Sequence, residues 1–498
     1  MDAELLELVT FLNKNKTKNL EIIGQENASP SMVQEFYTKL CEKAFQTEDQ
    51  VAQYFFQSDA NNRNYKELKR RLKSRLLDTV LFIDVNQEGF TSYQKAYYSS
   101  QKELSAASIL YYRGMYKAAV PLLLKLEKRA VKNCFMDILV QTAAMLIGYN
   151  GLVLQDLKKV DHYSQLLAKA NKGLFLEQKA LEYNAKLQIF HTQQKPNLRV
   201  LNERAKVFFE ELNKEKTDFV SYRFLIYYWN IEHIIYFAGW ELEKWLDSSN
   251  QIIAFLKKEI PAFTAARLHF LKRKVDCCLL LEKYEEGLLA VEEMSNTKGK
   301  TVLSDINCNK YRIQLLLCTK NHQEAYKCFV ATSKKRSFSK LPMGNQEFWK
   351  IIEAYLNYFI EIKQIAPKKK KRFSIGKFLN EVPKYSKEKT AGNIPILIIQ
   401  ILFFIHRQQY GLTVRRLETL NKYRVRYLEE DTNIRSKIFI KMLLQIPKAD
   451  FKGDRVKVKT KALLQELNET SKVSSKQEVY TELVPYEHLW NLLLQTLP

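Results

Sequence analysis

The chain has 498 residues, of which 46% are apolar, and its 28 Phe and 27 Tyr exclude an intrinsically disordered protein. With only 14 Gly and 11 Pro there are too few turn residues for an all-β fold, so helix is the expected secondary structure. The net charge of +24 is concentrated, because residues 361–461 carry 25 Lys and Arg against 9 Asp and Glu, a net of +16.

The cysteines and the apolar segments indicate the compartment. Seven Cys is an odd number, and the adjacent pair Cys277 and Cys278 is poorly placed for a disulfide, which favours a reducing environment. The N-terminal residues do not have the pattern of a secretory signal. The longest apolar stretch, 394–405, has twelve residues, whereas a membrane span needs about 20. We therefore expect a soluble cytoplasmic protein with no membrane partner, and a buried helix at 394–405.

The N-terminal region contains amphipathic helices. Leu68, Leu72 and Leu76 recur at helical spacing and predict one buried face. The opposite face carries Lys69, Arg70 and Lys73, which form a candidate secondary basic patch. The alternative, which the residues favour, is that these cations are simply the polar face that any amphipathic helix needs.

From about residue 100 a motif recurs in which an aromatic residue or His is followed three residues later by a small residue. Its clearest copy is at 106–119, and further copies are at 278–287 and 316–325. Tyr284 and His322, which occupy the same place in two copies, are 38 residues apart. Recurrence of this kind indicates a helical repeat protein.

These segments resemble tetratricopeptide (TPR) helix hairpins, whose period is 34 residues. Residues 113–119 contain the G-x-Y-x-x-A core, whereas the copy at 316–325 has Asn321 and His322 in place of Gly and Tyr. The resemblance covers about 100–350 and the region of 410–420, and it implies an all-α fold, a TPR-like α-solenoid of stacked hairpins. The chain also resembles uncharacterised helical proteins of Bacteroidota-type bacteria, which favours a bacterial cytoplasm.

Composition divides the chain into five predicted segments. The last one ends in an amphipathic stretch, 486–493, which either caps the solenoid or docks into a partner; we favour the cap. The segments are an N-terminal helical region (1–99), TPR-like repeats (100–365), a basic connecting segment (366–393), basic helical hairpins (394–468), and a polar linker with the terminal amphipathic helix (469–498).

The candidate site is cationic, and such a surface attracts phosphates or acidic protein faces. Three tyrosines interleave with it, Tyr410, Tyr423 and Tyr427; they either stack on bases or, as we favour, belong to the core. The run at 368–372 has a competing interpretation as a solvated loop that keeps the protein soluble. The candidate residues are Lys368, Lys369, Lys370, Lys371, Arg372, Lys377, Arg415, Arg416, Lys422, Arg424 and Arg426.

Metal or catalytic chemistry is not indicated. Cys318 and His322 are four residues apart, but the other cysteines lack the paired spacing of zinc ligands. The acids at 429–431 point in different directions if they are helical, and they suit surface ion pairs or a cap better than a catalytic pair. No nucleotide-binding loop, nucleophile elbow or metalloprotease motif is present. We expect no enzyme activity, no metal and no cofactor.

The sequence therefore predicts a non-enzymatic helical-repeat scaffold or adaptor that binds a protein partner, with a basic C-terminal surface for an acidic partner. The alternative is a nucleic-acid-associated factor, riding on RNA, a ribosome or a polymerase assembly, which binds the phosphate backbone through residues 361–461. No small-molecule substrate is evident from the residues.

Overall fold

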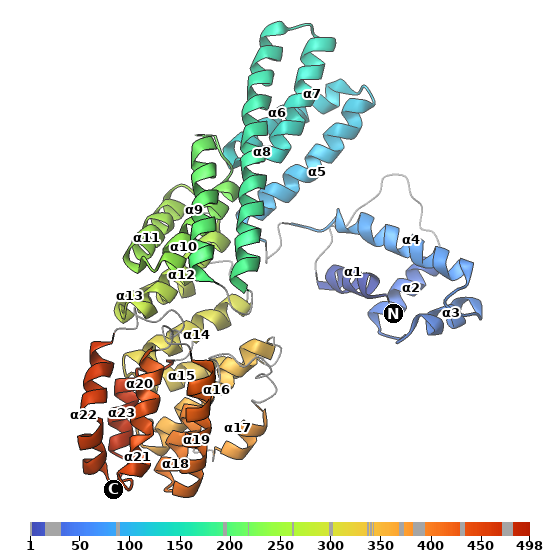
Figure 1. The fold of residues 1–498 in the computed structure, drawn as a ribbon. Helices are drawn as coiled ribbons and strands as arrows, with labels where there is room; N and C mark the ends of the chain where they lie inside the picture. Colours follow the sequence, from blue (N-terminus) through green and yellow to red (C-terminus); the bar gives the residue numbers. More distant parts are fainter. Residues whose placement is uncertain are drawn as a thin grey trace. The chain divides into compact units, whose positions relative to one another are not determined.

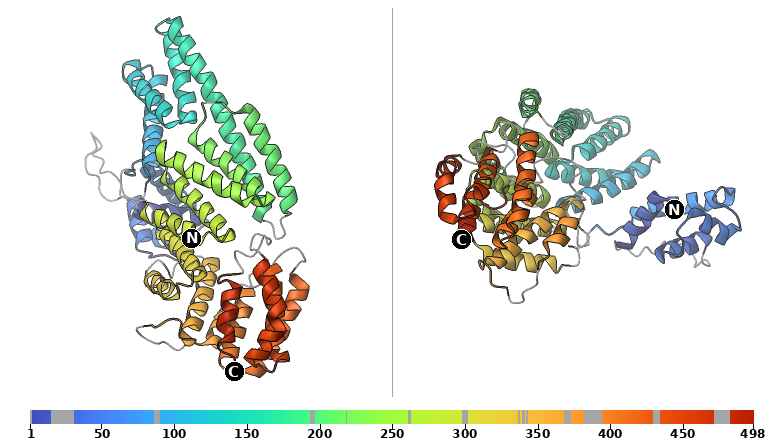
Figure 2. Two further views of the ribbon diagram at one scale, coloured as in Figure 1. Left: turned by 90° about the vertical axis from the view of Figure 1, so that its left-hand side faces the viewer. Right: turned by 60° about the horizontal axis from the view of Figure 1, so that its bottom comes forward.

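This computed structural model describes residues 2–14, 31–85, 90–192, 197–217, 219–260, 263–297, 302–335, 338, 341, 343–367, 373–381, 394–428, 434–470 and 482–498. Within these ranges the secondary structure is helical and contains no strand (Figure 1). The expected all-α fold is thereby confirmed. Most consecutive helices pack side by side as neighbouring pairs (Figure 2).

The chain forms two compact units, which divide between Phe175 and Leu176 inside helix α8. Unit 1 comprises residues 1–175 and 219–221. The five predicted segments follow composition rather than compactness, and their boundaries stay predictions. The helices up to and including α8 are α1 (Ala3–Lys14), α2 (Met32–Cys41), α3 (Glu48–Phe56), α4 (Arg63–Val80), α5 (Ser92–Tyr112), α6 (Tyr116–Asn133), α7 (Met136–Leu152) and α8 (Leu157–Thr192).

Unit 2 contains the rest of the chain, including the basic region. The apolar stretch predicted as a buried helix is α18, in which Ile398, Ile399 and Leu402 are fully buried. The helices of unit 2 beyond α8 are α9 (Leu198–Glu215), α10 (Tyr222–Gly239), α11 (Leu242–Lys258), α12 (Thr264–Leu280), α13 (Tyr284–Asn296), α14 (Val302–Cys318), α15 (His322–Ser333), α16 (Met343–Glu361), α17 (Ile375–Glu381), α18 (Ile394–His406), α19 (Tyr410–Tyr427), α20 (Ile434–Leu443), α21 (Gln445–Lys448), α22 (Gly453–Glu469) and α23 (Tyr486–Leu494).

One turn geometry recurs where helices end. A residue in the left-handed conformation follows the helix, and the N–H of the next residue donates to the carbonyl five residues earlier, at 2.8–2.9 Å. This pattern satisfies a carbonyl that the end of a helix leaves without a partner. A side chain at such a position costs about 1–2 kcal/mol, which glycine avoids. The left-handed residues are Gly114, Trp240, Glu282, Lys320, Lys363 and Gln408, with φ between +55° and +73°.

The small residue of the sequence motif lies where the two helices of a hairpin cross. Ala119, Ala325 and Thr413 are fully buried at this position. At Gly287 of α13 an added Cβ would lie 3.3 Å from Cys278 Cβ of α12, the other helix of its hairpin, and 2.9 Å from Leu315 Cδ2 of α14, so a larger side chain would press on both neighbouring helices. The sequence pattern therefore reports a real packing constraint.

The C-terminal helix packs against its own chain. Tyr486, Leu489 and Trp490 of α23 are buried in the same hydrophobic core as α18 and α20. This arrangement agrees with the favoured prediction of a cap and leaves few apolar side chains of α23 for a partner groove.

Substitution of Ala119 by Asp tests the crossing. The variant places a charge where the wild-type side chain is fully buried, so we expect the free energy of unfolding to fall by about 3 kcal/mol or more. Ala118→Asp is the matched control because Ala118, one residue earlier on α6, is exposed. Urea denaturation followed by circular dichroism measures both, and equal stability of the two variants would contradict the crossing at Ala119.

Candidate cationic interface

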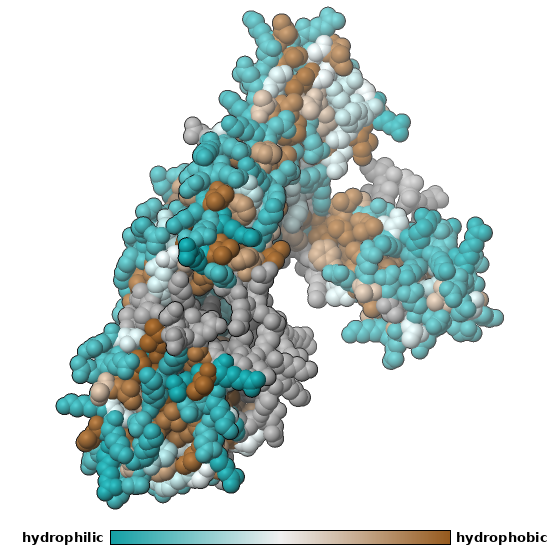
Figure 3. Space-filling model, viewed as in Figure 1, coloured by the Kyte–Doolittle hydropathy of each residue, from teal (hydrophilic) through white to brown (hydrophobic). Residues whose placement is uncertain are grey.

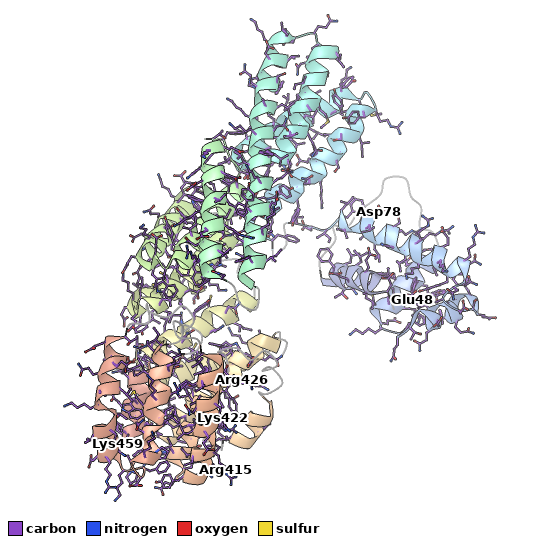
Figure 4. All side chains as sticks on the ribbon, viewed as in Figure 1. Glu48, Asp78, Arg415, Lys422, Arg426 and Lys459 are labelled. Carbon is purple, nitrogen blue, oxygen red and sulfur yellow. The ribbon has the colours of Figure 1, made fainter. Side chains whose placement is uncertain are left out.

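Helix α19 displays a line of cationic side chains along its exposed face. Thr413, Leu417 and Leu420 face the core, and this fixes the orientation of the helix. Arg415, Lys422 and Arg426, seven and four residues apart, are exposed (Figure 4). The predicted sharing of one helical face by these three residues is confirmed.

Two of these cations form no ion pair among the described residues. In the described parts of the chain, no carboxylate lies within 4.0 Å of the charged nitrogens of Arg415 or Lys422. Glu418, the only acidic residue of α19, is exposed and lies three residues after Arg415 and four before Lys422. We call these four residues the cationic stripe: Arg415, Glu418, Lys422 and Arg426. Along the helix their charges are positive, negative, positive and positive.

The other predicted cations lie apart from the stripe. Arg416 and Arg424 are half-buried on the flanks of α19, and Arg424 donates to Asn421 Oδ1 at 3.0 Å through Nη2. Lys377 is exposed on α17. The run from Lys368 to Arg372 lies outside the described residues, as do the acids at 429–431.

The tyrosines of this region pack inward. Tyr410 lies against Phe451, with ring centroids 4.1 Å apart, and Tyr423 is partly buried against the hydrophobic core. The side chain of Tyr427 is outside the described part. Tyr410 and Tyr423 are half-buried in these contacts, which favours the core interpretation over stacking on bases.

Basic residues of α22 are partly neutralised within their own helix and its preceding turn. Arg455 pairs with Asp450 at 2.9 Å, and Lys457 pairs with Asp454 at 3.4 Å. Lys459 is exposed and donates to the carbonyl of Lys448 (Figure 4). The high net charge of residues 361–461 therefore overstates the charge available on this helix.

The secondary basic patch is engaged in ion pairs of the N-terminal helices. Lys69 Nζ lies 2.9 Å from Asp2 and 3.1 Å from Glu48. Lys73 lies 2.8 Å from Glu4. Arg70 lies 2.8 Å from its neighbour Glu67 on α4. These contacts favour the interpretation of Lys69, Arg70 and Lys73 as the polar face of α4.

His322 belongs to an aromatic stack rather than to a set of metal ligands. Its ring lies on Phe359, with centroids 4.2 Å apart, and its Nε2 is 3.0 Å from Nε2 of His488 in α23. Burial lowers the pKa of both His322 and His488 to about 4, so both rings are neutral at pH 7. One therefore donates and the other accepts. Among the described residues, no three His, Cys, Asp or Glu are grouped to hold a metal.

A buried arginine, Arg435, organises the C-terminal helices and was not singled out by the sequence as a buried group. Its guanidinium pairs with Glu482, which is 3% exposed, at 2.9 Å, and with Glu487 at 2.5 Å. It also donates to the carbonyls of Leu467 and Thr470 at the end of α22. These contacts satisfy all five N–H donors of the arginine side chain. Arg435 thereby ties α20, α22 and α23 together.

Unit 1 has an exposed surface of a different kind at the turn from α7 to α8. Leu152 is 86% and Leu157 71% exposed, and Val153 and Leu154 between them are also exposed. Figure 3 shows apolar residues at this turn, at the top of the view. A cluster of large exposed aliphatic side chains is characteristic of a surface that contacts another molecule.

Comparisons with known families, with curated protein sequences and with solved structures find no match to this chain. In the described part of the chain, no helix has both the length and the apolar composition that crossing a membrane requires.

The histidine pair predicts a pH dependence of stability. As the pH falls from about 6.5 to 4, unfolded chains take up protons at His322 and His488 before folded chains do, so the folded state loses stability over this window. Replacing both by Phe keeps the stack and removes the titration. We expect the urea midpoint of the wild type to fall more steeply over this pH window than that of the double variant. If the midpoints of the two proteins change in parallel with pH, the histidine pair does not contribute to the pH dependence of stability.

The buried ion pairs of Arg435 predict a large loss of stability when this side chain is truncated. Arg435→Ala leaves Glu482 buried without a cation, and we expect a loss of about 3–5 kcal/mol in the free energy of unfolding. Arg407→Ala removes a more exposed pair with Glu361 and should cost about 1 kcal/mol or less. Denaturation with guanidinium chloride measures the stability of both variants. Equal losses of stability would show that the buried ion pairs of Arg435 stabilise the fold no more than the more exposed pair of Arg407 does.

Proposed function

We propose that this protein is a non-enzymatic helical-repeat scaffold of the cytoplasm, a TPR-like α-solenoid that binds a protein partner and contacts an acidic face of that partner through the cationic stripe of α19. The apolar turn between α7 and α8 supports a protein partner, because large exposed aliphatic groups gain most by burial in a protein interface.

The repeat assignment rests on the hairpin turns. From Trp240 to Gln408 the successive left-handed residues are 42, 38, 43 and 45 residues apart. These intervals exceed the 34 residues of the TPR because helices α10, α12, α14 and α16 have 17–19 residues each. The buried small residues at 287, 325 and 413 supply the close crossings that such hairpins need.

The single observation that carries the choice of partner is Glu418 within the cationic stripe. Measured from Arg415 along the axis of α19, Glu418 lies at about 4.5 Å, Lys422 at about 10.5 Å and Arg426 at about 16.5 Å. A phosphate backbone presents only negative charge and is repelled by Glu418. An acidic protein face is able to place a cation opposite Glu418 and carboxylates opposite the other three, which makes the charge pattern selective.

The second candidate is a nucleic-acid-associated factor that contacts phosphates through residues 361–461. The observation in its favour is that Arg415 and Lys422 are exposed and have no acidic partner among the described residues. Against it, Tyr410 and Tyr423 pack inward. Binding of this kind would be indifferent to base sequence and would weaken steeply with salt.

Reversal of the cationic stripe tests the proposal. We expect the variant with Arg415, Lys422 and Arg426 changed to Glu to capture its partner about tenfold less well from nuclease-treated lysate, because three complementary charges become repulsive. The matched control changes Lys169, Lys172 and Lys206 to Glu, which alters the net charge equally at exposed positions elsewhere. Affinity purification with quantitative mass spectrometry measures both variants. Equal capture by the two variants would contradict the proposal.

Glu418→Gln in the same assay separates the two candidates. A protein partner with a cation opposite Glu418 is captured less well by this variant, whereas phosphate binding becomes tighter and more salt-dependent. Loss of all partners on nuclease treatment also favours the second candidate. In that case neutralising Lys368 to Arg372 should flatten the dependence of binding on salt.

A further inference from the structure

A pocket of about 460 Å³ opens between α10 and α11. This volume lies within the range of small-ligand sites. Its lining combines three aromatic rings with two carboxylates and a hydroxyl. The lining residues are Trp229, Glu232 and Tyr236 from α10, and Lys244, Asp247, Ser248, Gln251, Ile252 and Phe255 from α11.

The pocket lies in a hairpin that departs from the small-residue rule. At the crossing position of α11, three residues after the helix begins, stands Trp245, which is buried. Its ring packs against Phe237 at 5.7 Å and His233 at 6.2 Å between centroids. Trp245 occupies far more volume than Ala119 or Gly287 does in the other hairpins, and α10 and α11 pack less closely than the helices of those hairpins do.

The aromatic walls favour a positive charge. Trp229 and Phe255 are perpendicular, with centroids 5.4 Å apart and an interplanar angle of 72°. Tyr236 adds a third ring to the lining. The electron-rich faces of aromatic rings attract ammonium and guanidinium groups, tryptophan most strongly.

The carboxylates of the pocket have no cationic partner among the described residues. Glu232 Oε2 accepts a hydrogen bond from Ser248 Oγ at 2.8 Å, and Oε1 accepts one from Tyr236 at 3.4 Å, so only neutral hydroxyls hold it. Asp247 is exposed and likewise forms no ion pair in the described structure. The two acids therefore leave their negative charge available to a ligand.

The cation of the lining does not cancel this potential. Lys244 lies at the rim, but its ammonium is 2.5 Å from Glu241 Oε2. His233, behind the pocket, is 3% exposed, and burial lowers its pKa well below the ordinary value, so it is neutral at pH 7. The net charge of the lining is negative.

The larger groove of about 840 Å³ between α13, α14 and α15 differs in this respect. Carboxylates there face a similar number of cations: Glu285, Glu292 and Glu324 share the lining with Arg312, Lys327 and Lys335. Opposite charges in one lining neutralise each other, so that groove has no preference for the sign of a ligand.

We propose that the pocket between α10 and α11 binds the guanidinium or ammonium group of a basic side chain from a bound polypeptide. The alkyl part of an Arg or Lys side chain would lie along Phe255 and Trp229, and its charged end would reach Glu232 and Asp247. This inference rests on the proposed scaffold function for the source of the side chain. It adds a second point of recognition, opposite in sign to the stripe on α19.

The test titrates the full chain with N-acetyl-arginine amide and N-acetyl-lysine amide. N-acetyl-citrulline amide, which has nearly the shape of arginine without its charge, is the control ligand. Incorporation of 5-fluorotryptophan gives a fluorine resonance for Trp229, assigned with the Trp229→Phe variant. We expect the cationic amides to shift the Trp229 resonance and the citrulline amide to leave it unchanged.

Two variants make the result specific. Glu232→Gln and Asp247→Asn should each weaken binding of the arginine amide about tenfold, since each removes one charge at the pocket. The matched control is Glu285→Gln together with Glu292→Gln in the larger groove, which should bind the amide as the wild type does. Unchanged fluorine spectra of the other tryptophans confirm that the variants fold.

Equal shifts with citrulline amide, or unaltered arginine binding by both pocket variants, would overturn the inference. Its failure is distinguishable from failure of the scaffold proposal, because free amides are titrated here without any partner. If the chain binds arginine amide but captures no partner, the pocket proposal stands and the scaffold proposal is wrong. If the chain captures a partner but does not bind arginine amide, the scaffold proposal stands and the pocket proposal is wrong.

Discussion

The packing of this protein depends on the close crossing of two helices within each hairpin. At Gly287 of α13 an added Cβ would lie 3.3 Å from Cys278 Cβ of α12, the other helix of its hairpin, and Ala119 and Ala325 are fully buried at the equivalent place. A helix that approaches this closely covers the apolar stripe of its neighbour, and the pair then presents a surface to the next hairpin. The left-handed residue between the helices sets the reversal of the chain that makes the approach possible.

Departures from this rule create the features that distinguish one hairpin from another. Trp245 replaces the small residue in α11, and the pocket with Glu232 and Asp247 lies between that helix and α10. In the C-terminal helices the packing depends instead on Arg435, whose buried charge is matched by Glu482 and Glu487. A buried guanidinium with every donor satisfied fixes the mutual position of its partners more strictly than apolar contacts do. Helix α19, which carries the cationic stripe, packs against α20.

The candidate surfaces show how net charge in a sequence differs from charge at a surface. Lys69 and Lys73 are paired with Glu48 and Glu4, residues that are distant in the sequence. On α19 the helical period alone places Arg415 and Lys422 on one face, and the sequence shows this directly. Their lack of acidic partners depends on how α19 packs, which the period does not report.

By itself the sequence determined the helical class, the hairpin motif with its small residue, the burial of 394–405 and the shared face of Arg415, Lys422 and Arg426. These properties are local, because residues within one or two helical turns fix them. Tertiary structure alone decided the pairing of His322 with His488, which are 166 residues apart, the burial of Arg435 beside Glu482, and the assembly of the α10–α11 pocket. Each of these joins groups whose separation along the chain carries no periodic signal, so only the packing of the helices brings them into contact.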